Sequence, residues 1–142
     1  MMLAGALCLV LAGIAALHAY WGLGGRWPGH DEAGLADRVI GKTSGGRMPP
    51  PAACFAVAVA ILAGVSLIAL VSFRDLQGPS KLLVQLAYGV FTAVFLLRGM
   101  AGYVPAIWQR SAGTAFVRLN TRYYSPLCIL LGAGLIANLA GR

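Results

Sequence analysis

The chain has 142 residues, of which 59% are hydrophobic and only 11% are charged, and its formal net charge is +7. A soluble domain is about 45–50% apolar and about 25% charged, so both values indicate that lipid is the solvent. The charges lie only in the gaps between apolar runs, where basic loops ordinarily contact anionic headgroups. This placement excludes a nucleic-acid-binding protein, and the length corresponds to one domain.

Four apolar runs predict four membrane-crossing helices within one transmembrane domain, residues 1–142. A helix needs about 20 apolar residues to cross a bilayer, and the runs give helices over about 2–24, 51–73, 82–103 and 123–140. Helices are expected because an open strand would leave backbone groups unpaired in lipid. The predicted fold is therefore an all-α integral membrane four-helix bundle with up-down-up-down order.

The loops that join these helices are unequal in length and charge. Loop 26–50 is basic and rich in Gly and Pro, residues 31–40 within it suit one short helix, and the following helix is expected to start at Pro51. Loop 104–122 suits an amphipathic segment in the membrane interface. Eight of the 11 Lys and Arg residues lie in or beside these two loops. The positive-inside rule then places both loops in the cytoplasm and both termini outside, in a multi-pass protein of the inner or plasma membrane.

The polar residues of the spans gather at one predicted membrane face. In a hairpin topology this face holds the ends of runs 2–24 and 82–103 and the start of run 123–140, and the opposite face is expected to carry nothing comparable. We predict a ligand-binding site there. Its candidate residues are His18, Tyr20, Trp21, Arg98, Arg122 and Tyr124. For the aromatic members, a belt at the headgroup level is the simpler interpretation.

His18 and Arg98 interrupt otherwise apolar runs, where an ionisable side chain is by default a functional hypothesis. His18 either binds a headgroup, relays a proton or ligates a metal, or it is a neutral histidine bonded to a neighbouring helix. Arg98 stays charged, so it either reaches an acid of loop 26–50, caps carbonyls at a helix end, or meets a lipid phosphate. The only other histidine is His30, so neither a metal site nor a cofactor is expected.

Small residues recur at every fourth position along the run 51–73. They are Ala52, Ala56, Ala60 and Gly64. Small residues at this spacing let helix backbones approach closely, which predicts a helix-packing face. The alternative is a groove for a lipid tail.

Three segments carry a resemblance to a known family. They are His18-Ala-Tyr-Trp-Gly-Leu-Gly-Gly-Arg26-Trp27-Pro28-Gly29, Phe95-Leu-Leu-Arg98-Gly99 and Leu119-Asn-Thr-Arg-Tyr-Tyr-Ser-Pro-Leu-Cys128. In this order they resemble the domain-of-unknown-function family DUF3995, a family of small bacterial membrane proteins, over nearly the whole chain. The resemblance implies the four-helix architecture and supplies no activity, substrate or catalytic residue.

Three functions fit this pattern. The favoured one is a non-enzymatic membrane protein whose polar cluster binds a lipid headgroup, a small ligand or a membrane partner protein. The second is a membrane enzyme on a lipid-soluble substrate, with His18 as acid/base and Arg98 holding an anionic group; it is disfavoured because no nucleophile–base pair, carboxylate pair or metal cluster appears. The third is a small transporter subunit that works as a homodimer through the Ala52, Ala56, Ala60 and Gly64 face.

Overall fold

The computed structural model describes residues 2–75 and 77–141, and its regular structure is entirely helical. The α-helices are α1 (Met2–Gly22), α2 (Glu32–Val39), α3 (Pro51–Phe73), α4 (Gly78–Ala101), α5 (Ala115–Leu119) and α6 (Ser125–Ala140). Short 3₁₀ segments lie at η1 (Ser44–Gly46) and η2 (Pro105–Ser111), and a π-helical turn, η3 (Asn120–Tyr124), joins α5 to α6. No strand occurs in the described ranges, so the all-α prediction is confirmed.

Four helical stretches are long and apolar enough to cross a membrane. They are α1, α3, α4 and the continuous stretch Ala115–Ala140, which includes α5, η3 and α6. By length and composition, these stretches indicate a multi-pass membrane protein. The last one begins eight residues before the start expected at Tyr123, because the π turn continues the helix instead of ending it.

Local sequence signals explain where the other helices begin and end. The Asp31 side chain caps α2 by accepting a hydrogen bond from the Gly34 backbone N–H at 2.7 Å. Helix α3 starts at Pro51, since proline is tolerated in a first helical turn. Helix α1 ends at Gly22, and Gly24 just beyond it has φ of 89°, a conformation that glycine adopts without strain. Helix α4 starts at Gly78, earlier than the expected Leu82, with a proline in its first turn.

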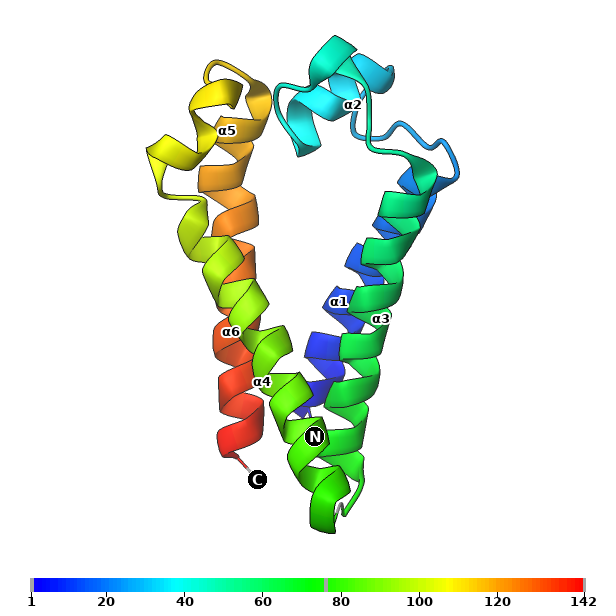
Figure 1. Cartoon of the computed structure of the whole chain (residues 1–142), viewed down its shortest axis with the longest axis vertical. Coiled ribbons are helices and arrows are strands. Elements are labelled where there is room, and N and C mark those ends of the chain that lie inside the picture. Colours follow the sequence, from blue (N-terminus) through cyan, green and yellow to red (C-terminus); the bar gives the residue numbers. More distant parts are fainter. Residues whose placement is uncertain (1, 76, 142) are drawn as a thin grey trace.

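The four long helices form two pairs, α1 with α3 and α4 with α6 (Figure 1). The pairs lie close together at the end of the molecule that carries both chain termini, and they separate toward the end that carries α2 and α5. A shared core includes Leu7, Leu11, Ile68, Tyr88 and Leu135, each at most 6% exposed. The two pairs are therefore joined mainly near the chain termini, which we call the terminal end.

Residues 26–50 and 102–124 form a cap over the other end of the long helices, which we call the capped end. The Lys42 backbone N–H donates to Ser111 Oγ at 3.1 Å, and the Ala115 N–H donates to Asp37 Oδ2 at 3.3 Å. The Tyr124 hydroxyl donates to the Arg38 carbonyl oxygen at 3.1 Å. These bonds join the two segments of the cap across the gap between the diverging helix pairs (Figure 1). Loops 26–50 and 104–122 thus contact each other at the capped end.

The small-residue face predicted on α3 is only partly used inside the chain. Gly64 is buried, and a Cβ there would collide with the Phe91 ring of α4. Ala52, Ala56 and Ala60 are exposed, while α3 buries other residues, among them Cys54, Ala58 and Ile61. Helix packing by the three alanines therefore stays a prediction, and it would require contact with a helix of a second molecule.

Candidate functional site

His18 lies near the end of α1, partly buried at the capped end. Its Nδ1 is 2.9 Å from the Ile14 carbonyl oxygen. A carbonyl oxygen can only accept, so Nδ1 carries the proton and Nε2 is left as an acceptor in the neutral ring. His18 is thus bonded to its own helix. The alternative given from the sequence, a neutral histidine bonded to a neighbouring helix, placed this bond on the wrong helix. Its ring also meets the Trp21 ring edge-on, with centroids 5.1 Å apart.

The aromatic residues around His18 tie the end of α1 to the loop that follows. Trp21 Nε1 donates to the Trp27 carbonyl oxygen at 2.7 Å, and the Tyr20 hydroxyl accepts from the Trp27 N–H at 3.4 Å. His18 and Trp21 also line a small pocket of about 170 Å³ between α1, α2 and α3, whose other lining residues include Met48 and Cys54. That volume is below the roughly 300 Å³ at which ligand pockets begin. No cation lines this pocket, so it offers no anion site.

Arg98 lies in the last turns of α4 and makes a different set of contacts. Its Nη2 donates to Asn120 Oδ1 at 2.8 Å, and its guanidinium carbon lies 5.3 Å from the centre of the Trp108 ring. Within the described residues, no carboxylate forms an ion pair with it, and the acids of loop 26–50 are engaged elsewhere or exposed. The charge of Arg98 is therefore stabilised by a neutral amide and an aromatic face alone.

Asn120 is held opposite Arg98 by the junction of α4 and α6. It is fully buried at the first position of the π turn η3, and Ser125 Oγ donates to its Oδ1 at 3.3 Å. The two helices approach closely here, since a Cβ on Gly102 would collide with Ser125 and one on Gly99 would crowd Ile129. Close packing and the π turn together fix the amide beside the guanidinium. Single π turns inside α-helices occur frequently at functional sites.

Two donors in this cluster have no acceptor. Arg98 Nη1 and Asn120 Nδ2 are buried atoms without a hydrogen-bond partner. Exchanging the oxygen and nitrogen of the Asn120 amide would not give Nδ2 an acceptor, because the oxygen must face the donating Arg98 Nη2. An unsatisfied buried donor costs about 1–3 kcal/mol, and more when it is charged. We call Arg98, Trp108, Asn120 and Ser125 the Arg98 cluster.

The remaining predicted site residues lie outside the Arg98 cluster. Tyr124 faces the cap, where its ring lies 6.3 Å from Phe116 and its hydroxyl bonds to α2. Arg122 is exposed, and its guanidinium carbon lies 5.5 Å from the centre of the Tyr123 ring. The structure thus places all six predicted residues at the capped end but divides them among separate contacts. No hydrogen bond or ring contact in the described part of the chain joins His18 to Arg98.

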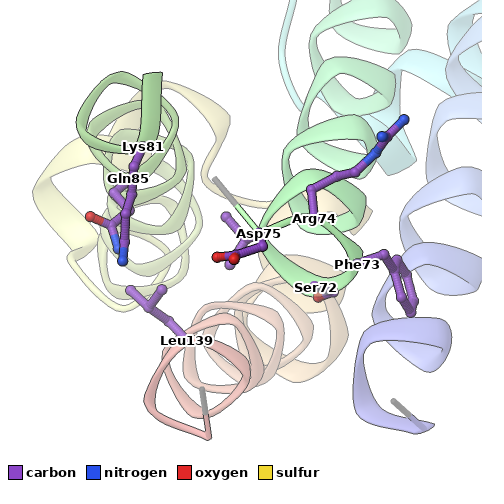
Figure 2. A pocket seen from close by; sticks show the side chains of 8 residues that line it. Ser72, Phe73, Arg74, Asp75, Lys81, Gln85 and Leu139 are labelled. Atoms are coloured by element: carbon purple, nitrogen blue, oxygen red, sulfur yellow. The ribbon is translucent and has the colours of Figure 1, made fainter. Parts of the chain in front are cut away.

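The terminal end also carries polar groups, which corrects the expectation that it has nothing comparable. Asn138 Nδ2 donates to Ser72 Oγ and to the Tyr88 hydroxyl, each at 3.2 Å, so it links α6 to α3 and α4 as expected of a polar residue in a span. A cavity of about 800 Å³ lies beside Ser72. Figure 2 shows the side chains that line it. Residues 2–75 and 77–141 contain no group of three His, Cys, Asp or Glu side chains that could hold a metal ion.

Comparison with known proteins places the chain in a family. No curated protein and no solved structure matches it. One family model matches residues 11–135, which is most of the chain and includes His18, the Arg98 cluster and both capping loops. The chain therefore belongs to DUF3995, a family described as proteins of unknown function.

Proposed function

We propose that this protein is a membrane protein that binds an anionic group, such as a phosphate or carboxylate, at the Arg98 cluster. The observation that carries the proposal is the pair of buried donors without acceptors, Arg98 Nη1 and Asn120 Nδ2. Nη1 is attached to the same carbon as Arg98 Nη2, and Nδ2 to the same carbon as Asn120 Oδ1. Nη2 and Oδ1 form the 2.8 Å hydrogen bond between the two side chains. The two donors therefore belong to side chains that are already in direct contact.

An anion fits this place better than a water molecule does. Water would satisfy the donors but leave the Arg98 charge unpaired near the end of an apolar helix, where a lone charge is costly. An oxyanion supplies both the acceptors and the compensating charge, and arginine is well suited to bind such groups through two parallel hydrogen bonds. The centre of the Trp108 ring lies 5.3 Å from the guanidinium carbon, at a distance where an aromatic ring stabilises the charge.

The test is the thermal unfolding of the purified protein in a mild detergent, with inorganic phosphate or phosphatidylglycerol as the added anion. A ligand at 100 times its Kd stabilises a protein by about 2.7 kcal/mol, which corresponds to a rise in Tm of several degrees, at about 2–4 °C per kcal/mol. We expect this rise in the wild type and its loss in Arg98→Gln. A rise with the lipid alone would identify a headgroup, and a rise with both would identify a free anion site.

The matched control is Arg118→Gln, which removes an equal charge from an exposed position of α5. It should keep the full rise in Tm. If neither anion raises the Tm of the wild type, or if both variants lose the rise equally, binding at the Arg98 cluster is refuted.

We further propose that the capped end faces the cytoplasm and that both termini lie outside the cell membrane. The support is the uneven charge: eight of the 11 Lys and Arg residues lie in or beside the two loops of the cap. The other three basic residues are Arg74, Lys81 and Arg142, of which Arg142 lies outside the described residues. The test uses single cysteines placed at Thr43 or Gln77 and a maleimide that does not cross membranes. Labelling of intact cells at position 77 but not at 43 is expected, and the reverse pattern would contradict this orientation.

A further inference from the structure

The cavity at the terminal end has the size and the lining of a small-ligand site. Its volume of about 800 Å³ lies within the usual range of ligand pockets, roughly 300–1,000 Å³. The end of α3, the turn after it, the start of α4 and the end of α6 all contribute to its lining (Figure 2). It lies at the ends of three candidate membrane spans, so its mouth is at the level of the lipid headgroups.

Opposite charges face each other across this cavity without pairing. Figure 2 shows Lys81 and Gln85 running together from α4 and the Asp75 carboxylate facing them from the turn, and Arg74 also lines the cavity. Asp75 accepts a hydrogen bond from Gln77 Nε2 at 2.8 Å, which helps to hold its carboxylate in place. In the described part of the chain, neither Lys81 nor Asp75 forms an ion pair. The cavity thus presents a cation with an amide on one side and an anion on the other.

The inner wall of the cavity is firmly held. Ser72, which lines it, is only 4% exposed and bonds to the buried Asn138. Tyr88 bonds to the same amide, and its hydroxyl also donates to the Leu135 carbonyl oxygen at 2.9 Å. This network joins α3, α4 and α6 directly behind the cavity, so the three walls keep a fixed spacing.

We propose that this cavity binds a zwitterionic group that carries a phosphate and a primary ammonium, as in the headgroup of phosphatidylethanolamine. The Lys81 ammonium and the Gln85 amide donate hydrogen bonds to the phosphate oxygens. The Asp75 carboxylate accepts hydrogen bonds from the ligand's ammonium group. Such a ligand pairs the Lys81 and Asp75 charges at once, whereas a simple anion or cation would pair only one of them. Val71 and Leu139 provide an apolar edge for the adjoining part of a lipid.

The test measures which lipid the protein retains from an equal mixture of phosphatidylethanolamine, phosphatidylcholine and phosphatidylglycerol, using native mass spectrometry. Phosphatidylcholine has the same charges but no N–H on its quaternary nitrogen, so it cannot donate a hydrogen bond to Asp75. We expect phosphatidylethanolamine to be preferred over phosphatidylcholine by about fivefold, since an exposed charged contact contributes up to about 1 kcal/mol. Asp75→Asn should abolish this preference, and Lys81→Gln should lower the retention of all three lipids.

Arg118→Gln is the charge control, because it removes one positive charge from an exposed position of α5 that does not line this cavity. It should leave the preference unchanged. Arg98→Gln should leave it unchanged too, which separates this site from the one proposed at the capped end. Soluble phosphoethanolamine that competes as well as the lipid would identify a free aminophosphate as the ligand, and weaker competition would identify the lipid. Equal retention of phosphatidylethanolamine and phosphatidylcholine, or equal effects of Arg118→Gln and Lys81→Gln, would overturn the proposal.

Discussion

Replacing Asn120 by aspartate tests the physical reasoning behind the Arg98 cluster. The substitution keeps the shape of the side chain, retains the oxygen that accepts from Arg98 Nη2 at 2.8 Å, and turns the unpartnered Nδ2 donor into a second acceptor. It removes one orphan donor, worth about 1–3 kcal/mol, and supplies the carboxylate that Arg98 lacks. The cost of burying the new charge is offset because a buried cation already lies beside it.

We therefore expect Asn120→Asp to stabilise the ligand-free protein by about 1–3 kcal/mol. At about 2–4 °C per kcal/mol, its Tm in a mild detergent should rise by several degrees. The same variant should no longer respond to phosphate or phosphatidylglycerol, because the new carboxylate occupies the place of the anion and repels it. A Tm that falls without ligand, or an undiminished response to the anions, would refute the reasoning.

The matched control is Asn138→Asp, the same substitution at another buried position of α6. Its Nδ2 donates to both Ser72 and Tyr88. The Tyr88 hydroxyl proton is already donated to the Leu135 carbonyl oxygen, so an aspartate would lose the bond to Tyr88. No cation contacts Asn138 among the described residues to pair with the new charge. The Tm of this variant should fall, so one chemical change is expected to have opposite effects at two positions.

Three further predictions concern residues in and around the Arg98 cluster. Gly102→Ala, just after the end of α4, should lower the Tm by forcing a methyl group against Ser125, at a cost of about 1–3 kcal/mol. Gly89→Ala within α4, with open space beside it, should not lower the Tm. Tyr124→Phe removes the bond from η3 to α2 and should speed hydrogen exchange in residues 32–39 while sparing α3. Arg122→Gln should leave the anion-induced rise in Tm intact, since Arg122 contacts only the Tyr123 ring; a lost rise would instead support the site predicted from sequence.

The long helices were predictable from the sequence because their signals are local. Uninterrupted apolar length identifies a span without reference to its neighbours. The limits of α2 and α3 follow from the Asp31 cap and the prolines before Ala52, and the end of α1 follows from Gly24. The Asn138 bonds to other helices are of the kind that a polar side chain within a span ordinarily makes across a helix interface.

The candidate site could be located at one end of the molecule but not resolved into its contacts. The pairing of Arg98 with Asn120 depends on the close approach of α4 and α6 at Gly102 and on the π turn, and no pattern in the sequence specifies that turn. The missed residues Trp108 and Ser125 had weak signals, because one is a loop aromatic and the other a common first-turn residue. The six predicted residues are divided because the two helix pairs separate toward the capped end.

The partner of the small-residue face on α3 could not be predicted from the sequence either. A repeat of exposed alanines is compatible with contact to another molecule as well as to a helix of the same chain, and of the four residues only Gly64 is buried in this one. Tyr88 was counted as part of an apolar run, although its hydroxyl belongs to the polar network at the terminal end. Partner choice in both cases depends on how the helices rotate against each other, which the composition of a span does not specify.

The most direct test of the central claim is native mass spectrometry of the protein released from a mild detergent, comparing wild type, Arg98→Gln and Arg118→Gln. We expect the wild type and Arg118→Gln to retain an anionic lipid or small anion that Arg98→Gln has lost, with all three proteins equally helical. A wild-type protein that carries no such ligand, or an Arg98→Gln variant that retains it fully, would contradict the claim that the Arg98 cluster binds an anion.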